Sequence, residues 1–312
     1  MFDIVRYTSE KAGEWNSFVA TSKNGTFLFD RSYMDYHSDR FNDFSLMFYR
    51  DDALYALMPA NAERDTLCSH RGLTYGGIVM QENAVAEAIQ QLFRELNDYL
   101  RKTGFRKVIY KTVPHIYHRI PSEEDWFSLF SICDAKLVDR SLSSAIDLSH
   151  PLKWRRDRRY GVNKAFVNGV QVGESNDWKG FWEVLTTNLM NKYGAKPVHT
   201  LQEIELLSSR FPKNIRLFTA EKDGKILGGT VLYVTPTVVH SQYISASAEG
   251  KNLRVNDAIF DYLLHGCEWH ARYFDFGTSN EEDGRILVEP LIYQKEGFGG
   301  RGICYDWYEW TL

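Results

Sequence analysis

The spacing of apolar and polar residues predicts that the same order of strands and helices runs twice through the chain. In the first half, two apolar runs separated only by Asp51 and Asp52 predict a hairpin. A later stretch repeats its apolar residues at helical spacing until Gly104, which favours a left-handed turn at a helix end. The elements expected in this half are strands at 46–50, 53–60, 66–70 and 107–113 and helices at 84–103 and 123–130.

The second half repeats this order of elements without repeating the sequence. Its hairpin is expected to turn at Asp223 and Gly224, and Thr200 with Glu203 has the pattern of a capping box for a helix that ends at Arg210. The other elements expected are a helix at 177–194, strands at 215–222, 225–234, 237–246 and 273–277, a loop at 247–251, and a helix marked by Val255, Ile259, Tyr262, Leu263 and Trp269. The repeated order indicates a structural duplication, with one domain over residues 1–150 and a second over 151–312.

Composition supports two globular domains and limits the choice of partners. A chain of 312 residues, 44% of them hydrophobic, can fill two cores, and its net charge of −4 provides no general attraction for DNA. Four widely spaced cysteines are typical of reduced thiols, and the first residues lack the pattern of a signal peptide. No apolar run approaches the ~20 residues that span a bilayer, so we expect a cytoplasmic protein without a transmembrane segment.

The most specific motif lies near the C-terminus and reads LIYQKEGFGG. The residues that match a pattern A-x-x-L-Y-x-K-x-G-F are Leu291, Ile292, Tyr293, Lys295, Gly297 and Phe298, and this motif closes the series of elements over 225–301. Both features resemble the acyl-CoA-binding half of the GNAT acyltransferase superfamily. The double glycine after Phe298 narrows the likeness to the branch of the Fem-type aminoacyltransferases of peptidoglycan synthesis. The resemblance implies an α/β fold with mixed sheets, built from two tandem GNAT-like domains packed together.

This resemblance also implies where an acyl donor binds. Acetyl-CoA or another acyl-CoA is expected as co-substrate of the second domain, with its pantetheine arm along the backbone of Ile244, Ser245 and Ala246. Gly250, Lys251 and Asn252 are the expected contacts to its phosphates. Most GNAT members carry Q/R-x-x-G-x-G/A at this point, where this chain has only SAEGK. Fem-type relatives also depart from that pattern and use aminoacyl-tRNA, and an ordinary polar helix start explains the pair of Gly250 and Lys251 equally well.

The candidate catalytic residues are Tyr293, His240 and Asp275. The resemblance places Tyr293 beside the donor sulfur, where a phenol of ordinary pKa near ~10 suits a departing thiolate. His240 lies on a strand whose alternation puts it on the same face as Gln242 and Ile244, and its ordinary pKa suits a general base. Asp275 lies within the expected strand 273–277, near the same cleft. Core packing for Tyr293 and a structural role for His240 are the competing interpretations.

The acceptor is expected to be an amine, on a small molecule or a cell-envelope precursor, bound between the two domains. Candidate contacts are Arg71 and Tyr75 in the first domain and Glu281, Glu289 and Lys295 in the second. An acidic cleft would attract an amine, although the charge run at Glu281 is also typical of a solvated turn.

A basic segment separates the two halves. Residues 153–164 carry six Lys or Arg side chains against Asp157. These side chains suit the phosphates of a nucleotide cofactor, a tRNA or a lipid diphosphate, and an ordinary solvated helix face explains them as well. The pairs His115 with His118 and Cys267 with His270 have no further ligands nearby, so no metal is expected.

The leading hypothesis from the sequence is an N-acyltransferase that uses acyl-CoA. The first alternative is a Fem-type transferase that takes an amino acid from tRNA, for which tRNA would be a partner. The second is a catalytically silent protein that binds a nucleotide-linked ligand with the same fold.

Overall fold

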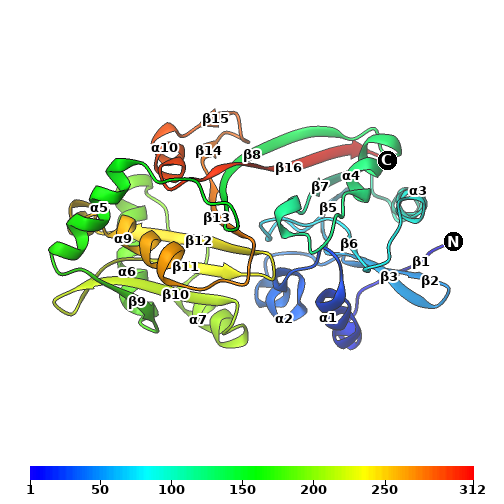
Figure 1. Cartoon of the computed structure of the whole chain (residues 1–312). Helices are drawn as coiled ribbons and strands as arrows, with labels where there is room; N and C mark the ends of the chain where they lie inside the picture. The colour runs from blue at the N-terminus through cyan, green and yellow to red at the C-terminus, as the bar shows by residue number, and fades with distance from the viewer. The chain divides into compact units, whose positions relative to one another are not determined.

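The computed structural model describes residues 1–312, apart from the side chain of Tyr193. The chain forms two compact units, one containing 1–142, 280–286 and 303–312 and the other 143–279 and 287–302 (Figure 1). The C-terminal strand therefore returns to the first unit. The boundary predicted from the sequence, between residues 150 and 151, assigns the whole C-terminal part to the second domain and so does not include this return. The division into domains at that point stays a prediction.

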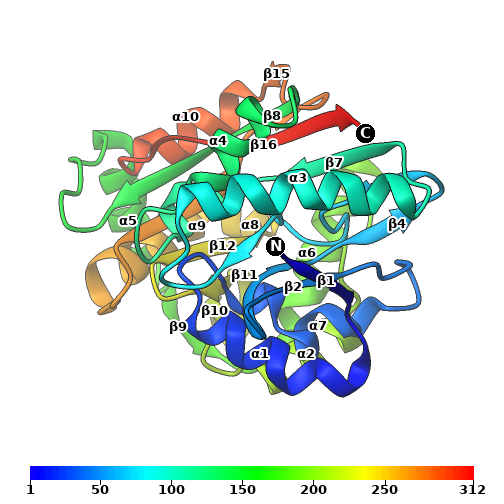
Figure 2. The ribbon, with the colours of Figure 1, turned by 90° about the vertical axis from the view of Figure 1, so that its right-hand side faces the viewer.

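The first unit contains two groups of strands covered by helices. One sheet has the order β1-β2-β3-β6, and the other strands of this unit follow the order β4-β5-β7-β16. Its strands are β1 (Asp3–Arg6), β2 (Leu46–Arg50), β3 (Ala53–Met58), β4 (Asn61–Glu63), β5 (Thr66–Cys68), β6 (Val79–Met80), β7 (Lys107–Lys111) and β16 (Arg301–Thr311). Its α-helices are α1 (Ala12–Thr21), α2 (Arg31–Met34), α3 (Ala86–Lys102) and α4 (Glu124–Ser131). The long helix α3 faces the viewer in Figure 2, and its Leu92 and Phe93 join Tyr110 and Trp310 in the core.

The second unit contains a run of hydrogen-bonded strands in the order β8-β13-β12-β11-β10-β9. These strands are β8 (Lys136–Asp147), which passes from the first unit into the second, β9 (Gln171–Ser175), β10 (Ile215–Lys222), β11 (Lys225–Val234), β12 (Val238–Ala246) and β13 (Tyr273–Thr278). Its helices are α5 (Arg156–Val167), α6 (Trp178–Tyr193), α7 (Leu201–Arg210), α8 (Ala248–Leu253), α9 (Val255–Asp261), the π-helical turn η5 (Tyr262–Gly266) and α10 (Glu289–Gly297); β14 (Asn280–Glu281) and β15 (Ile286–Leu287) form a short hairpin. None of the described helices is both long and apolar enough to cross a membrane.

Local sequence signals account for several of these element ends. The β10–β11 hairpin turns at Asp223 and Gly224, between the paired residues Lys222 and Lys225, as predicted. The capping box is also confirmed, because Thr200 Oγ1 accepts a hydrogen bond from Glu203 N at 3.2 Å and the Glu203 carboxylate accepts one from Thr200 N at 2.7 Å.

Two predictions about the segment after β12 are wrong. Residues 248–253 form the short helix α8 instead of a loop, because Ser247 caps it by accepting a hydrogen bond from Gly250 N at 3.0 Å. The helical region that follows ends at Gly266, before Trp269. The indole of Trp269 packs back on that helix and donates to Leu263 O at 2.6 Å, which explains its place in the apolar pattern.

Candidate active site

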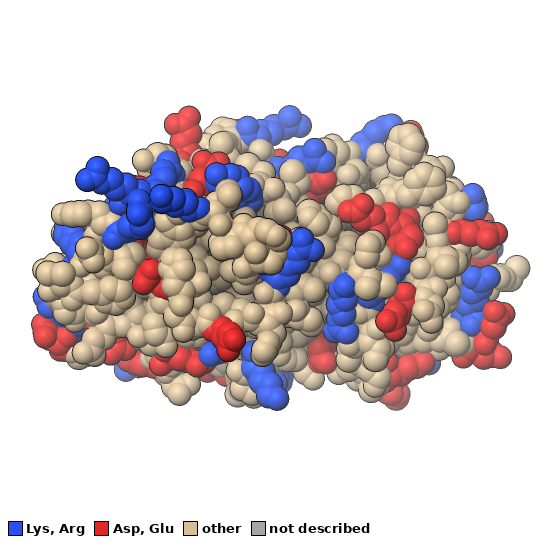
Figure 3. All heavy atoms as spheres, viewed as in Figure 1, with Lys and Arg blue, Asp and Glu red and all other residues tan. Residues whose placement is uncertain are grey.

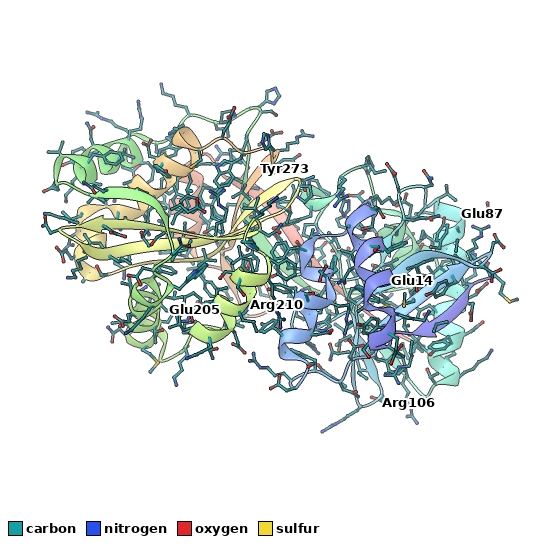
Figure 4. All side chains as sticks on the ribbon, turned by 90° about the horizontal axis from the view of Figure 1, so that it is seen from below. Glu14, Glu87, Arg106, Glu205, Arg210 and Tyr273 are labelled. Atoms are coloured by element: carbon teal, nitrogen blue, oxygen red, sulfur yellow. The ribbon has the colours of Figure 1, made fainter. Side chains whose placement is uncertain are left out.

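The candidate site starts where the parallel strands β12 and β13 separate. Pairing runs from Val238 opposite Tyr273, labelled in Figure 4, to His240 opposite Asp275. The parallel register ends there, although β12 continues to Ala246 and β13 to Thr278. On its other edge β12 stays paired with β11 as far as Ala246. The predicted donor contacts Ile244, Ser245 and Ala246 therefore lie on a stretch of β12 whose edge toward β13 is open.

Two buried polar atoms on β12 have no partner among the described residues. Ser245 Oγ and Gln242 Oε1 make no hydrogen bond to any described residue. Gln242 lies at an irregularity in the β11–β12 register, between the pairs of Tyr243 and Ser241. A buried polar atom left without a partner costs about 1–3 kcal/mol, so both atoms are suited to hydrogen bonds with a ligand.

His240 and Asp275 form a hydrogen-bonded pair at the point of separation. Asp275 is fully buried, and its Oδ2 lies 2.8 Å from His240 Nδ1. Its Oδ1 accepts from the Ser143 hydroxyl on β8 and, at 3.2 Å, from Gly277 N. Since all of these groups can donate to the carboxylate, a neutral imidazole at this position would hold its proton on Nδ1 and its lone pair on Nε2. The role of His240 as a base stays a prediction.

Lys295 joins this pair from helix α10. Its Nζ donates to the carbonyl oxygens of Gly277 and Thr278, both at 2.7 Å, at the end of β13. Burial lowers the pKa of Lys295 to about 8, and the negative charge of Asp275 partly opposes this effect. The structure thus brings three predicted residues together, His240, Asp275 and Lys295, and adds Ser143, which no pattern in the sequence had indicated.

Tyr293 lies on a different side of α10, with 54% of the residue exposed. The Arg155 guanidinium stacks over its ring at 3.6 Å and also donates to the Tyr293 carbonyl oxygen. Arg155 N donates to Gly297 O at 2.9 Å, which ties the start of α5 to the end of α10. Gly299, with φ of +96°, then turns the chain out of the helix, where a side chain would be strained and would crowd Leu152.

A cavity of about 350 Å³ opens beside Tyr293 and is rich in cationic groups. Arg158, Lys251, Arg254 and Asn256 are among the residues that line this cationic cavity. The buried Asp257 binds Arg158 at 3.0 Å and Arg254 at 2.5 Å, which leaves an excess of positive charge. Asn256 Oδ1 is buried and makes no hydrogen bond to any described residue. The excess positive charge suits a phosphate-bearing ligand, while the acceptor Asn256 Oδ1 suits a hydroxyl or N–H donor of the same ligand.

Of the three predicted phosphate contacts, Lys251 is among the residues that line this cavity, and Gly250 and Asn252 are not. The amide of Gly250 already donates to Ser247 Oγ, and Asn252 is exposed on α8. Side chains rather than loop amides therefore provide most of the positive potential.

The remaining predicted residues are divided between the two units. In the first unit Tyr75 is buried and its hydroxyl lies 3.0 Å from Thr26 Oγ1, while Arg71 pairs with Glu63 at 3.3 Å. Glu281 is exposed on β14, and Glu289 is exposed as the first residue of α10 in the second unit. Their role in binding an acceptor stays a prediction. Among the described residues, no group of three His, Cys, Asp or Glu side chains is arranged to hold a metal.

Comparisons with known proteins agree with this geometry. Residues 153–283 match a family model described as an acetyltransferase (GNAT) domain. The crystal structure of FemX superposes with a TM-score of 0.71 at 12% identity, covering 99% of this chain and 97% of that chain. A conserved protein of unknown function from Bacteroides thetaiotaomicron gives 0.66 at 12% identity, covering 100% of both chains. A tandem GNAT protein from the clavulanic acid biosynthesis pathway gives 0.53 at 10% identity, covering 100% and 98%.

No curated protein matches the chain. At such low identity the similar structures establish the fold alone. They confirm the prediction of a mixed α/β fold with two GNAT-like domains and its likeness to the Fem-type branch.

Proposed function

We propose that the protein transfers an acyl group from an acyl-CoA to an amine, because residues 153–283 match a GNAT domain model and the fold is similar to a tandem GNAT protein and to FemX. One observation carries this proposal. The open edge of β12 leads directly to the His240–Asp275 pair, so a thioester held along that edge would lie beside an oriented base. Acetyl-CoA is the smallest such donor.

The residues present fit an acyl-CoA. The partnerless Ser245 Oγ and Gln242 Oε1 suit the amides of a pantetheine arm, and the cationic cavity suits phosphates. Backbone amides of Ile244 and Ser245 are candidates to stabilise the developing oxyanion. The donor itself supplies a thioester whose carbonyl carbon is open to attack by an amine.

The proposed proton transfers use His240 and Tyr293. As the nitrogen of the neutral amine bonds to the carbonyl carbon, His240 Nε2 takes one proton from that nitrogen. The carbon–sulfur bond breaks, and the Tyr293 phenol supplies a proton to the departing thiolate. Solvent returns the proton from His240 to Tyr293, so the products are an amide and a free thiol. Asp275 and Lys295 act by positioning His240 and the end of β13.

A second candidate is a Fem-type transferase that takes its acyl group from aminoacyl-tRNA. One observation favours it. Residues 248–253 form the capped helix α8, so the amide of Gly250 is already used where other GNAT members hold pyrophosphate. The cationic cavity suits the 3′ end of a tRNA as well as the phosphates of CoA.

A thermal-shift experiment separates the donors. The Tm is measured with acetyl-CoA, free CoA and aminoacyl-tRNA, and a true ligand at 100 times its Kd stabilises the fold by about 2.7 kcal/mol. Lys251→Glu should abolish the shift, whereas Lys213→Glu, an exposed charge change in the same unit, should keep it. Thiol release from acetyl-CoA with a panel of amines then tests the reaction. A rise in Tm with aminoacyl-tRNA but not with acetyl-CoA or CoA would favour the second candidate. No change in Tm with any of them would favour a silent binding protein.

A further inference from the structure

Helix α5 presents a mixed basic and apolar face to solvent. Arg158, Gly161 and Ala165 are buried on the side of α5 that faces the rest of the second unit, and α5 packs on α9. The opposite side carries apolar residues with unusual exposure, including Val167 at 85% and Tyr160 at 69%. Phe166 on α5 and Leu152 in the segment before it are exposed as well.

The cations on the same side are not neutralised by the protein. The side chains of Lys153, Arg156, Arg159 and Lys164 make no hydrogen bond or ion pair within the described part of the chain. Asp157, the acidic residue of this helix, is engaged by Arg158 at 2.7 Å. Figure 3 shows the resulting concentration of Lys and Arg over the position of α5. These four cations and the four exposed apolar residues are called here the α5 face.

An apolar cavity of about 410 Å³ lies beside the α5 face. Its walls include Leu148, Leu152, Trp154, Val162 and Leu264. Lys153 and Arg159 also border it, as do Asp261 and His265. An apolar hollow next to cationic groups is complementary to an amphiphile with an anionic head and a hydrocarbon tail.

We propose that the α5 face binds the surface of a bilayer that contains anionic phospholipid. Basic residues near such a surface are attracted to its negative potential, while exposed apolar side chains enter the boundary between headgroups and acyl chains. The apolar component decides between a bilayer and a nucleic acid. Phosphates of RNA would form ion pairs with the cations but would not bury Val167 and Leu152, whose exposure to water is unfavourable.

Sedimentation with vesicles tests this inference. The full-length protein is mixed with vesicles of phosphatidylcholine alone or with about one-third phosphatidylglycerol, at low and at high salt. Wild type is expected to bind the anionic vesicles strongly at low salt and more weakly, through its apolar residues, at high salt. In Arg156→Gln/Lys164→Gln it should weaken about 25-fold, about five-fold for each charge removed. The matched control Arg94→Gln/Lys102→Gln changes two exposed cations on α3 of the first unit and should bind like wild type.

A second variant makes the test specific for a bilayer. Tyr160→Ser/Val167→Ser keeps every charge and should lose vesicle binding at high salt, where only the apolar contribution remains. Equal melting temperatures for all variants exclude unfolding as the cause of lost binding. The inference is overturned if the anionic vesicles bind no better than phosphatidylcholine, if the α3 control loses as much, or if tRNA displaces the vesicles while the Tyr160/Val167 variant binds them fully. Loss of acyl transfer plays no part in the readout, so the proposed function and this inference fail independently.

Discussion

Asp275→Asn is the sharpest test of the proposed base. The carboxylate accepts the Nδ1 proton of His240 at 2.8 Å and so leaves Nε2 as the acceptor. An amide in its place presents a donor to the imidazole, which then holds its proton on Nε2 and is unable to take one from the amine. The variant keeps the shape of the site and reverses only the direction of this hydrogen bond.

The expected effect is a loss of rate with little loss of stability. A positioned general base contributes about 10²–10⁴ in rate, so kcat should fall about 1000-fold. With the amide nitrogen facing His240, the amide oxygen takes the place of Oδ1 and still accepts from Ser143 and Gly277. The Tm should therefore stay close to that of wild type.

The assay measures thiol release at saturating donor and amine, with Tm and donor Kd determined in parallel. Asp147→Asn is the matched control, because Asp147 pairs with the exposed Arg272 at 3.0 Å and such a pair contributes less than about 1 kcal/mol. Its activity should equal that of wild type. Near-normal turnover in folded Asp275→Asn would refute the assignment of His240 as an oriented base. A loss of kcat that merely follows unfolding would also count against it.

Three further predictions test other parts of the second unit. Tyr293→Phe should slow turnover about 100-fold with unchanged donor Kd, since it removes only the acid, and wild-type turnover would exclude that role. Lys295 has a pKa of about 8 in the folded protein against the ordinary lysine value of 10.5, so between these values the unfolded chain binds more protons and stability rises with pH. The free energy of unfolding should be measured in urea from pH 7 to pH 10. Above pH 8 that of wild type should rise relative to that of Lys295→Met, and a difference that does not change with pH would contradict this. Arg158→Ala should lower the free energy of unfolding in urea by about 3 kcal/mol, because the buried Asp257 carboxylate loses one of its two ion-pair partners. Arg216→Ala breaks the more exposed pair with Glu174 and should lower it by less than about 1 kcal/mol.

Much of the fold was predictable because the signals that form its elements are local. The turn at Asp223 and Gly224 and the capping box of Thr200 and Glu203 depend on residues within one turn of one another, and both are present as predicted. The helical spacing of apolar residues wrongly placed Trp269 within a helix. Its side chain packs against the end of that helix from the segment that follows. The long strands β8 and β16 were not predicted, since their pairing partners are distant in the chain.

Some residues of the candidate site were likewise predictable from local sequence, and others were brought together only by folding. The amino-acid sequence alone was enough to place a tyrosine and a lysine on α10 beside a helix end closed by glycines, because a short motif and the helical period suffice for that. Folding was needed to bring His240 to Asp275, 35 residues away, and Ser143 to the same carboxylate, 132 residues away. Parallel strands are joined by a long crossover instead of a tight turn, so no local turn fixes their register, which depends on which face of each strand is buried. The same packing decided where β12 and β13 part, and with it the open edge on which the proposed chemistry depends.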